Sequence, residues 1–201
     1  MVYTAVIEGK KVNGMDRHGA DAIVLGISGS LREQSSNSRL LSSIRGLLPD
    51  GMKLLLYDGL GRLPHFSPDL DGDDARPHEA VREWREQLQA ADAVVICTPE
   101  YARGVPGSLK NALDWVVSSG EFLNKPTAVI SASPHPGGGS TALASLMLTL
   151  NMMSASIPPE AAISIPFVSK KLGPDGNVID AKTLTSLRNL VQTLIRTVHK
   201  G

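Results

Sequence analysis

The stretch from Ala93 to Trp115 constrains the fold more than any other part of the chain. It opens with the apolar run 93–97, which is too short for a helix and rich in β-branched residues, and therefore predicts a buried strand. Pro99 ends that strand, and glycine and proline then impose an irregular loop. A helix is expected from Pro106, because proline fits a first helical turn and apolar residues then recur at helical spacing. A strand, a kinked loop and a helix N-terminus in this order suit a polar planar or anionic ligand.

A second stretch, residues 21–41, has a similar arrangement. The apolar segment 21–28 predicts a strand, after which Gly29 permits a tight turn. Arg32 offers a fork of donors suited to phosphate, and one of residues 35–37 can cap the helix that follows. The loop lacks the Gly-Lys pair of a P-loop, the third glycine of the dinucleotide fingerprint and the last glycine of a nucleophile elbow. It predicts an anion site of another type; the alternative is a serine-rich helix cap with a solvated arginine.

The stretch from Thr98 to Trp115 resembles the flavin-binding loop of the NAD(P)H-dependent FMN reductase family, which includes chromate, quinone and azo-compound reductases. The family pattern is close to T-P-E-Y-N-x-x-x-P-G-x-L-K-N-A-[IL]-D-W, and this chain departs from it at Ala102, where the family usually has Asn. The resemblance implies contacts with FMN, and backbone amides that stabilise negative charge on the reduced ring. The residues so assigned are Pro99, Glu100, Tyr101, Arg103 and Gly104.

Two further loops resemble parts of the same family. The loop after 21–28 is similar to the family loop G-S-L-R-x-x-S-x-N, which holds the FMN phosphate. By this resemblance the phosphate contacts are Ser30, Arg32, Ser35 and Asn37. The loop 131–140 follows the apolar strand 127–130, and its three consecutive glycines allow close backbone approach to a ligand. It is similar in position and composition to a family loop against the flavin ring, and Ser131 is carried over as a contact. His135 is interpreted as a loop histidine rather than a catalyst.

Predicted strands and helices alternate along the chain, which implies parallel strands with right-handed crossovers. Strands are expected at 21–28, 52–58, 92–97, 125–131 and 160–166, and helices at 37–48, 77–90, 106–118, 138–154 and 180–199. Five such strands suit a flavodoxin-like α/β sandwich with a parallel sheet in the order 2-1-3-4-5. The three loops described above follow strands 1, 3 and 4. They are therefore expected to meet at the carboxyl edge of the sheet, at its switch point.

Composition narrows the class of protein. With 201 residues one domain is expected, a reductase domain over 21–201 after an N-terminal extension over 1–20. The charges balance at zero without a basic run, which argues against a nucleic-acid surface. The single cysteine, Cys97, excludes an internal disulfide or a cysteine-built metal site, and the acidic loop 60–77 is interpreted as solvated surface rather than a metal site. No apolar run approaches the roughly 18 residues of a membrane span. Since residues 1–20 also lack a signal-peptide core, a cytoplasmic location is expected.

The resemblance implies an enzyme that binds FMN, takes hydride from NADPH or NADH and passes electrons to a second small molecule. Flavin, quinone, azo compounds and metal oxyanions such as chromate all stay open as acceptors. No catalytic side chain is assigned, because the flavin carries the chemistry. The alternative is a flavodoxin-type electron carrier, although three Phe, three Tyr and two Trp offer few aromatics to cover both ring faces. A flavin-free regulatory module would require both motif matches to be coincidences.

Homodimer or homotetramer formation is also implied by the resemblance, with the helix 106–118 contributing to the interface. That helix is apolar near its end. Trp115 could be buried within one subunit, or it could form an exposed patch that suits an interface.

Overall fold

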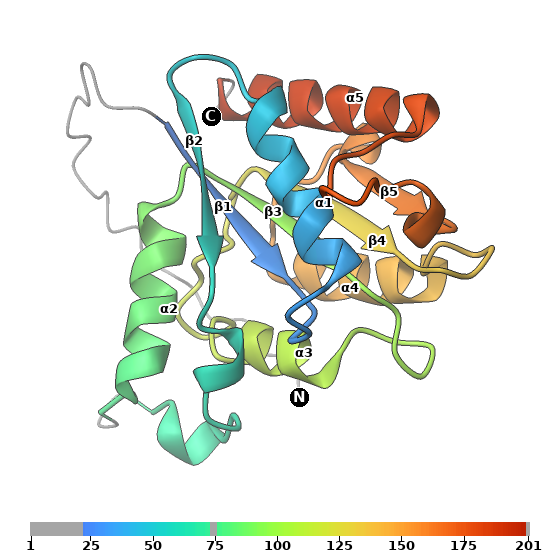
Figure 1. Cartoon of the computed structure of the whole chain (residues 1–201). Helices are drawn as coiled ribbons and strands as arrows, with labels where there is room; N and C mark the ends of the chain where they lie inside the picture. Colours follow the sequence, from blue (N-terminus) through green and yellow to red (C-terminus); the bar gives the residue numbers. More distant parts are fainter. Residues whose placement is uncertain (1–21, 73–75, 200–201) are drawn as a thin grey trace.

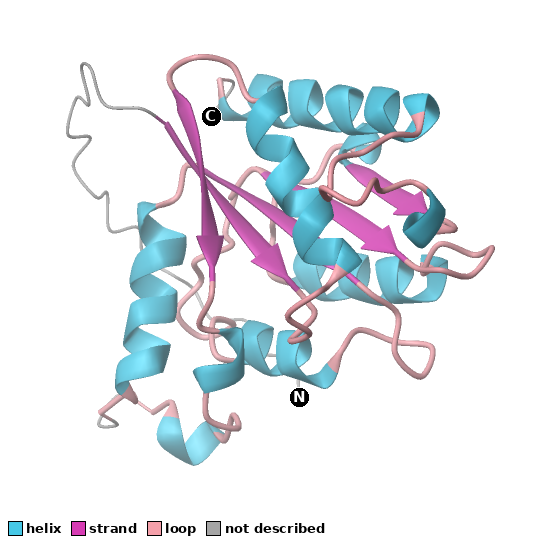
Figure 2. Ribbon diagram, in the orientation of Figure 1, coloured by secondary structure: helices cyan, strands magenta, loops and turns pink. Residues whose placement is uncertain are grey.

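The computed structural model describes residues 22–72 and 76–199 and confirms the predicted fold class. Five parallel strands form one sheet in the order β2-β1-β3-β4-β5, as Figures 1 and 2 show. The strands are β1 (Ala22–Ser28), β2 (Met52–Tyr57), β3 (Ala93–Thr98), β4 (Thr127–Ala132) and β5 (Ala162–Ile165). Every residue of β3 and β4 is buried, because both faces of these central strands are covered by helices.

Five helices cover the two faces of the sheet. They are α1 (Ser36–Ile44), α2 (Glu79–Ala90), α3 (Gly107–Asp114), α4 (Ser140–Met152) and α5 (Ala181–Val198). One core cluster joins α2, α3 and α4 to side chains such as Leu25 and Ile96, and the other joins α1 and α5 to neighbours such as Val24 and Val95. Adjacent residues of a strand thus serve opposite cores, as the two-residue period of a strand requires.

The expected element boundaries differ from the observed ones by a few residues. The first helix ends at Ile44 and tightens into a 3₁₀ turn over Arg45–Leu47, whereas one helix was predicted to residue 48. The predicted extension 1–20 lies outside the described residues. Within the described part of the chain, no helix is both long enough and apolar enough to cross a membrane.

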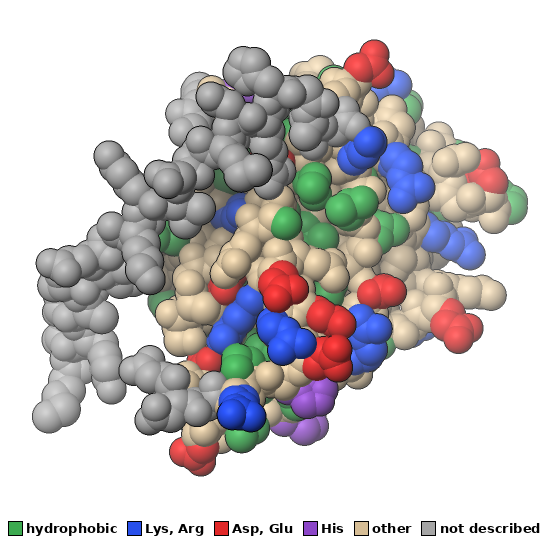
Figure 3. Space-filling model, turned by 90° about the vertical axis from the view of Figure 1, so that its left-hand side faces the viewer, with side chains coloured by type: hydrophobic (Ala, Val, Ile, Leu, Met, Phe, Trp, Pro, Cys, Tyr) green, Lys and Arg blue, Asp and Glu red, His purple; other side chains and the backbone are tan. Residues whose placement is uncertain are grey.

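β2 forms one edge of the sheet and carries exposed apolar side chains. Leu55 is 50% exposed and Leu56 is 40% exposed. Figure 3 views the molecule from the side of β2 and α2, where apolar side chains gather and both acidic and basic side chains lie around them. Charged groups next to an edge strand oppose its pairing with another strand.

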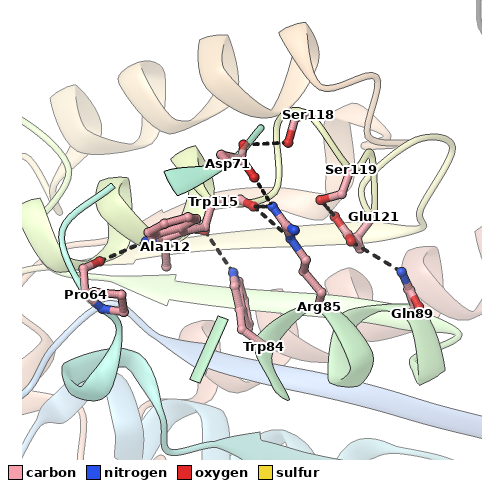
Figure 4. Close-up of polar contacts among 10 residues, drawn as sticks. All are labelled: Pro64, Asp71, Trp84, Arg85, Gln89, Ala112, Trp115, Ser118, Ser119 and Glu121. Carbon is pink, nitrogen blue, oxygen red and sulfur yellow. Dashed lines mark hydrogen bonds and ion pairs between the residues drawn. The ribbon is translucent and has the colours of Figure 1, made fainter. Parts of the chain in front are cut away.

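A partly buried ion pair fixes the loop between β2 and α2 (Figure 4). The Arg85 side chain, on α2, binds Asp71 and also donates from Nε and Nη2 to the Trp115 carbonyl at the end of α3. The Ser118 hydroxyl donates to the other Asp71 oxygen at 2.6 Å. The Asp71 side chain is only 10% exposed, so the prediction of a solvated acidic loop is wrong at this residue. The described residues contain no cluster of acidic, His or Cys side chains that could hold a metal ion.

Trp115 is buried within the subunit. Its side chain is 1% exposed, packs edge-to-face on Phe66 and donates to the Pro64 carbonyl at 2.8 Å. On α2, Trp84 donates to the Ala112 carbonyl at 2.8 Å. Of the two possibilities for Trp115, burial within one subunit is confirmed. Side chains of α2 and of the preceding loop therefore hold the end of α3, whose beginning follows the loop after β3.

Candidate functional site

The carboxyl edge of the sheet carries a cavity of about 340 Å³. Loops after β1, β3 and β4 line it, together with the turn after β5. Its lining residues are Ser30, Arg32, Gln34, Ser35, Ser36, Asn37, Pro99, Glu100, Tyr101, Ala132, Ser133, Pro134, His135, Val168 and Ser169. Seven of the ten predicted contacts are in this list. The other three, Arg103, Gly104 and Ser131, lie outside the lining.

Hydroxyl and amide side chains before and at the start of α1 accept hydrogen bonds from within the protein. The Ser35 Oγ caps α1 by accepting from the Asn37 N–H at 3.2 Å, and the Ser30 Oγ accepts from the Arg32 N–H at 3.3 Å. The Asn37 Oδ1 accepts from the Cys97 thiol at 3.3 Å. Because each of these oxygens already accepts a hydrogen bond, the hydroxyl and Nδ2 hydrogens remain as donors for a ligand.

Cys97 holds the Asn37 side chain in place through a hydrogen bond from its thiol. Its side chain is completely buried, and burial raises the pKa of the thiol. The sulfur therefore stays protonated and serves as a hydrogen-bond donor to Asn37.

Gly29 is required by close packing rather than by a tight turn. A Cβ at this position would lie 2.6 Å from the Thr98 Oγ1 and 3.0 Å from Leu109 Cδ2. The loop after β1 is thus pressed against the end of β3 and the first turns of α3. This contact brings the two ligand-facing loops together.

The loop after β3 folds into a small hairpin. Tyr101 and Gly104 exchange backbone hydrogen bonds of 3.1 and 3.0 Å, with Ala102 at φ 49° and Arg103 at φ 65° between them. Two central residues with positive φ make a type I′ turn, which favours Asn or Gly over Ala. The Gly104 N–H donates to the Tyr101 carbonyl. It is therefore not available to the flavin ring, which differs from what the family resemblance implied. Tyr101 is 48% exposed at the cavity, and Arg103 is exposed at the turn.

Glu100 links the loop after β3 to α4. Its Oε2 accepts from the backbone N–H groups of Thr141 and Ala142, at 3.0 and 3.1 Å. The capping residue of α4 itself is Gly139, which has no side chain for this purpose. A carboxylate at a helix N-terminus also interacts favourably with the helix dipole. Glu100 therefore fixes the relative positions of two loops that line the cavity.

Ser131 braces the third loop instead of lining the cavity. It is completely buried, and its Oγ donates to the Gly138 carbonyl and pairs with the Ser164 hydroxyl, both at 2.9 Å. Gly138 has φ 60°, and a Cβ there would lie 2.8 Å from the Pro166 nitrogen. The glycines of this loop were expected to make room for a ligand. At Gly138 the space is needed instead for the chain that leaves β5.

The turn after β5 completes the cavity and was not predicted to do so. Val168 and Ser169 line the cavity, and the Val168 N–H donates to the Ser133 carbonyl at 3.1 Å. No motif marks this turn. The predicted strand order alone could have identified it, because β5 lies beside β4 and its carboxyl end points the same way. His135, which was interpreted as a loop histidine, is exposed and also lines the cavity.

Comparisons with known proteins point to one family. Residues 23–170 match the family model of the NADPH-dependent FMN reductases. An NAD(P)H-dependent FMN reductase of Pseudomonas aeruginosa is 36% identical over 176 residues, covering 87% of this chain and 94% of that protein. A quinone reductase of Escherichia coli K12 is 30% identical over 82% of this chain and 88% of that protein. Among solved structures, FerB of Paracoccus denitrificans, a flavoenzyme NAD(P)H:(acceptor) oxidoreductase, superimposes with a TM-score of 0.76 at 32% identity, covering 89% of this chain and 98% of that one.

Proposed function

The chain belongs to the family of NADPH-dependent FMN reductases, and we propose that it transfers electrons from NADPH or NADH through FMN to a quinone or a free flavin. Bound FMN supplies a ring that takes hydride from a reduced nicotinamide and then reduces a second acceptor. The protein's part is to hold and orient that cofactor and to leave one face of the ring accessible.

One observation carries the assignment of the cofactor site. Around the start of α1 the acceptor atoms of Ser30, Ser35 and Asn37 are occupied within the protein, while their donor hydrogens remain for a ligand. Arg32 adds a permanent positive charge at the same end of the cavity. A phosphate monoester offers only acceptors and negative charge, so the chemistry of this donor set fits the FMN phosphate. The N-terminus of α1 adds a further favourable electrostatic contribution.

The flavin ring is proposed to lie between the loops after β3 and β4. Pro99, Glu100 and Tyr101 approach this part of the cavity from one side, and Ser133 and His135 approach it from the other. Tyr101 is the only Phe, Tyr or Trp in the described lining. A single aromatic side chain can cover one face of the ring and leaves the other for a nicotinamide. This supports a hydride-accepting enzyme over a flavodoxin-type electron carrier.

Quinones and flavins are the acceptors that the relatives support, since the similar proteins include both an FMN reductase and quinone reductases. Azo compounds and metal oxyanions are proposed as further acceptors. They require only that reducing equivalents reach an open ring face.

Self-association is proposed through the outer face of α4 rather than through Trp115. Leu148 is 74% exposed and Met152 is 61% exposed, one helical turn apart on the same face. Apolar side chains this exposed favour a homodimer or homotetramer in which α4 is covered by a second copy of the chain.

The experiment is a spectroscopic and kinetic assay of the purified protein. FMN added to the protein should bind with a shifted visible spectrum. Anaerobic NADPH or NADH should then bleach the flavin band by a two-electron reduction, and benzoquinone should restore it. A persistent radical spectrum without oxidation of either nicotinamide would contradict the proposal and favour an electron carrier.

A further inference from the structure

The turn after β5 carries an exposed aromatic side chain in a strained backbone conformation. Phe167 has φ 53° and ψ 36°, in the left-handed region that bulky residues rarely adopt. Its side chain is 42% exposed, so part of the ring is available to a ligand. Glycine or asparagine would adopt this conformation more easily. Strained backbone conformations of this kind cluster at active sites and ligand-binding positions.

A lysine accompanies this ring. The Lys170 ammonium lies over the Phe167 ring, 5.9 Å from its centre, within the range of a cation–π contact. The neighbouring Lys171 is paired with Asp180 at 3.8 Å, whereas Lys170 forms no ion pair among residues 22–72 and 76–199. The exposed ring and the adjacent cation, Phe167 and Lys170, are called the rim platform below.

The rim platform is attached directly to the cavity. The Phe167 N–H donates to the His135 carbonyl at 3.4 Å, and the next N–H, of Val168, donates to the Ser133 carbonyl at 3.1 Å. His135, Ser133 and Val168 all line the cavity. The platform therefore stands at the rim of the proposed flavin site, on the side of the loop after β4.

We propose that the rim platform binds the adenosine half of NADPH, with Phe167 stacking on the adenine and Lys170 contacting the 2′-phosphate. The inference rests on the proposed function, because the nicotinamide of the same molecule has to enter the cavity. Its adenosine then lies at the rim, where a planar base meets an exposed ring and a phosphate meets an ammonium. The chemistry of the platform matches both groups, because aromatic rings stack on bases of any type and lysine binds phosphate as a point charge. Because only NADPH carries the 2′-phosphate, the contact with Lys170 makes the enzyme prefer NADPH to NADH.

The test measures binding of two probes to the full-length protein by isothermal titration calorimetry. Adenosine 2′,5′-bisphosphate and adenosine 5′-monophosphate differ only in the 2′-phosphate. The wild type should bind the bisphosphate about tenfold more tightly, the size of one charge-assisted contact. Lys170→Ala should abolish that difference, and the ratio of kcat/KM for NADPH to that for NADH should fall in parallel. Arg45→Ala, which removes a cation beyond the end of α1 at the opposite edge of the sheet, is the matched control.

A second variant separates binding from folding. Phe167→Gly relieves the left-handed strain, so its melting temperature should not fall, while its affinity for both probes should fall about tenfold through loss of stacking. Phe167→Tyr should retain the affinity. Equal affinity of the wild type for both probes, unchanged probe affinity in Phe167→Gly, or a large loss of melting temperature in that variant would each overturn the proposal. FMN titration of the same samples tests the proposed function separately. A protein that binds the probes but does not bind FMN would contradict the proposed function and not the rim platform.

Discussion

In the proposed cofactor site, what a single residue can offer a ligand depends on which of its polar atoms already form hydrogen bonds within the chain. Ser30, Ser35 and Asn37 are common helix-cap residues, and sequence alone could not distinguish a solvated cap from a ligand site. The structure adds the state of single atoms: their side-chain oxygens accept hydrogen bonds within the chain and leave the hydroxyl and amide hydrogens as donors, which supports the proposed phosphate site. Arg32 differs from these residues, since it does not cap α1 and its positive charge favours an anionic ligand.

Replacing Arg32 tests the phosphate assignment. Arg32→Ala removes a charge-assisted contact of about 1.5–3 kcal/mol, so FMN affinity should fall roughly ten- to a hundredfold. Riboflavin lacks the phosphate, and its affinity should barely change. Both affinities can be measured by quenching of flavin fluorescence, with Arg45→Ala as the control for lost charge. Equal losses for the two flavins would show that Arg32 does not contact the phosphate.

Ala102 is expected to matter through its backbone. It occupies a turn position with φ 49°, where alanine costs about 1–2 kcal/mol and asparagine costs less. Ala102→Asn should therefore raise the melting temperature by about 1–4 °C, given about 0.5–1 kcal/mol of relief. FMN affinity should change less than twofold, because Ala102 lies outside the cavity lining.

Ala102→Gly is the control for this interpretation, because glycine accepts positive φ without adding a polar side chain. A second result would support a direct role for the asparagine of related proteins. If Ala102→Asn tightened FMN binding two- to tenfold while Ala102→Gly did not, the amide side chain would be a flavin contact worth about 0.5–1.5 kcal/mol.

Whole elements are positioned by contacts that no local motif encodes. α3 is held at its end by Arg85 and Trp84 from α2, and α4 is held at its start by Glu100 from the loop after β3. The sequence predicted both helices within a few residues. It could not predict these partners, because they are separated by 28 to 41 residues and only the packed sheet brings them together.

Glu100 is expected to couple the stability of α4 to the cofactor site. Glu100→Ala leaves two N–H groups of α4 without their acceptor, a loss of about 1 kcal/mol for a helix cap. For a protein of this size the melting temperature should fall about 2–4 °C. FMN affinity should fall as well, because the loops after β3 and β4 lose their shared contact. Glu100→Gln keeps an oxygen acceptor and should retain most of both properties; equal losses in the two variants would contradict the capping role.

At the scale of the whole molecule, the sheet order and the convergence of loops were predictable from the sequence. Alternating elements fix parallel strands, and the strand order places the loops after β1, β3 and β4 at one edge. Side-chain burial was less predictable. Trp115 and Ser131 were assigned possible surface or ligand roles from their position in a motif, yet both are buried and bonded within the chain. A motif locates a loop, but the direction of each side chain depends on the packing of distant residues.

The exposed apolar surfaces lead to a prediction about assembly. Two such surfaces are the face of α4 with Leu148 and Met152 and the edge strand β2 with Leu55 and Leu56. Charged side chains of both signs lie around the apolar group on the β2 side, so a partner there would also have to bury charges (Figure 3). The face of α4 carries no Asp, Glu, Lys or Arg, since none occurs between Ser140 and Met152. This difference favours α4 as the interface.

Leu148→Asp is therefore expected to dissociate the oligomer. A carboxylate at the centre of an apolar interface would lose its hydration, and the apolar side chains around it offer no hydrogen bond or opposite charge in compensation. Because Leu148 is 74% exposed in the single chain, the substitution should leave the melting temperature of the monomer nearly unchanged. Size-exclusion chromatography with light scattering should show a dimer or tetramer for the wild type and a monomer of about 21.3 kDa for the variant. Ile179→Asp is the matched control, because Ile179 is also apolar and 67% exposed but lies before α5. If the control dissociated the oligomer and Leu148→Asp did not, the interface would have to be moved away from α4.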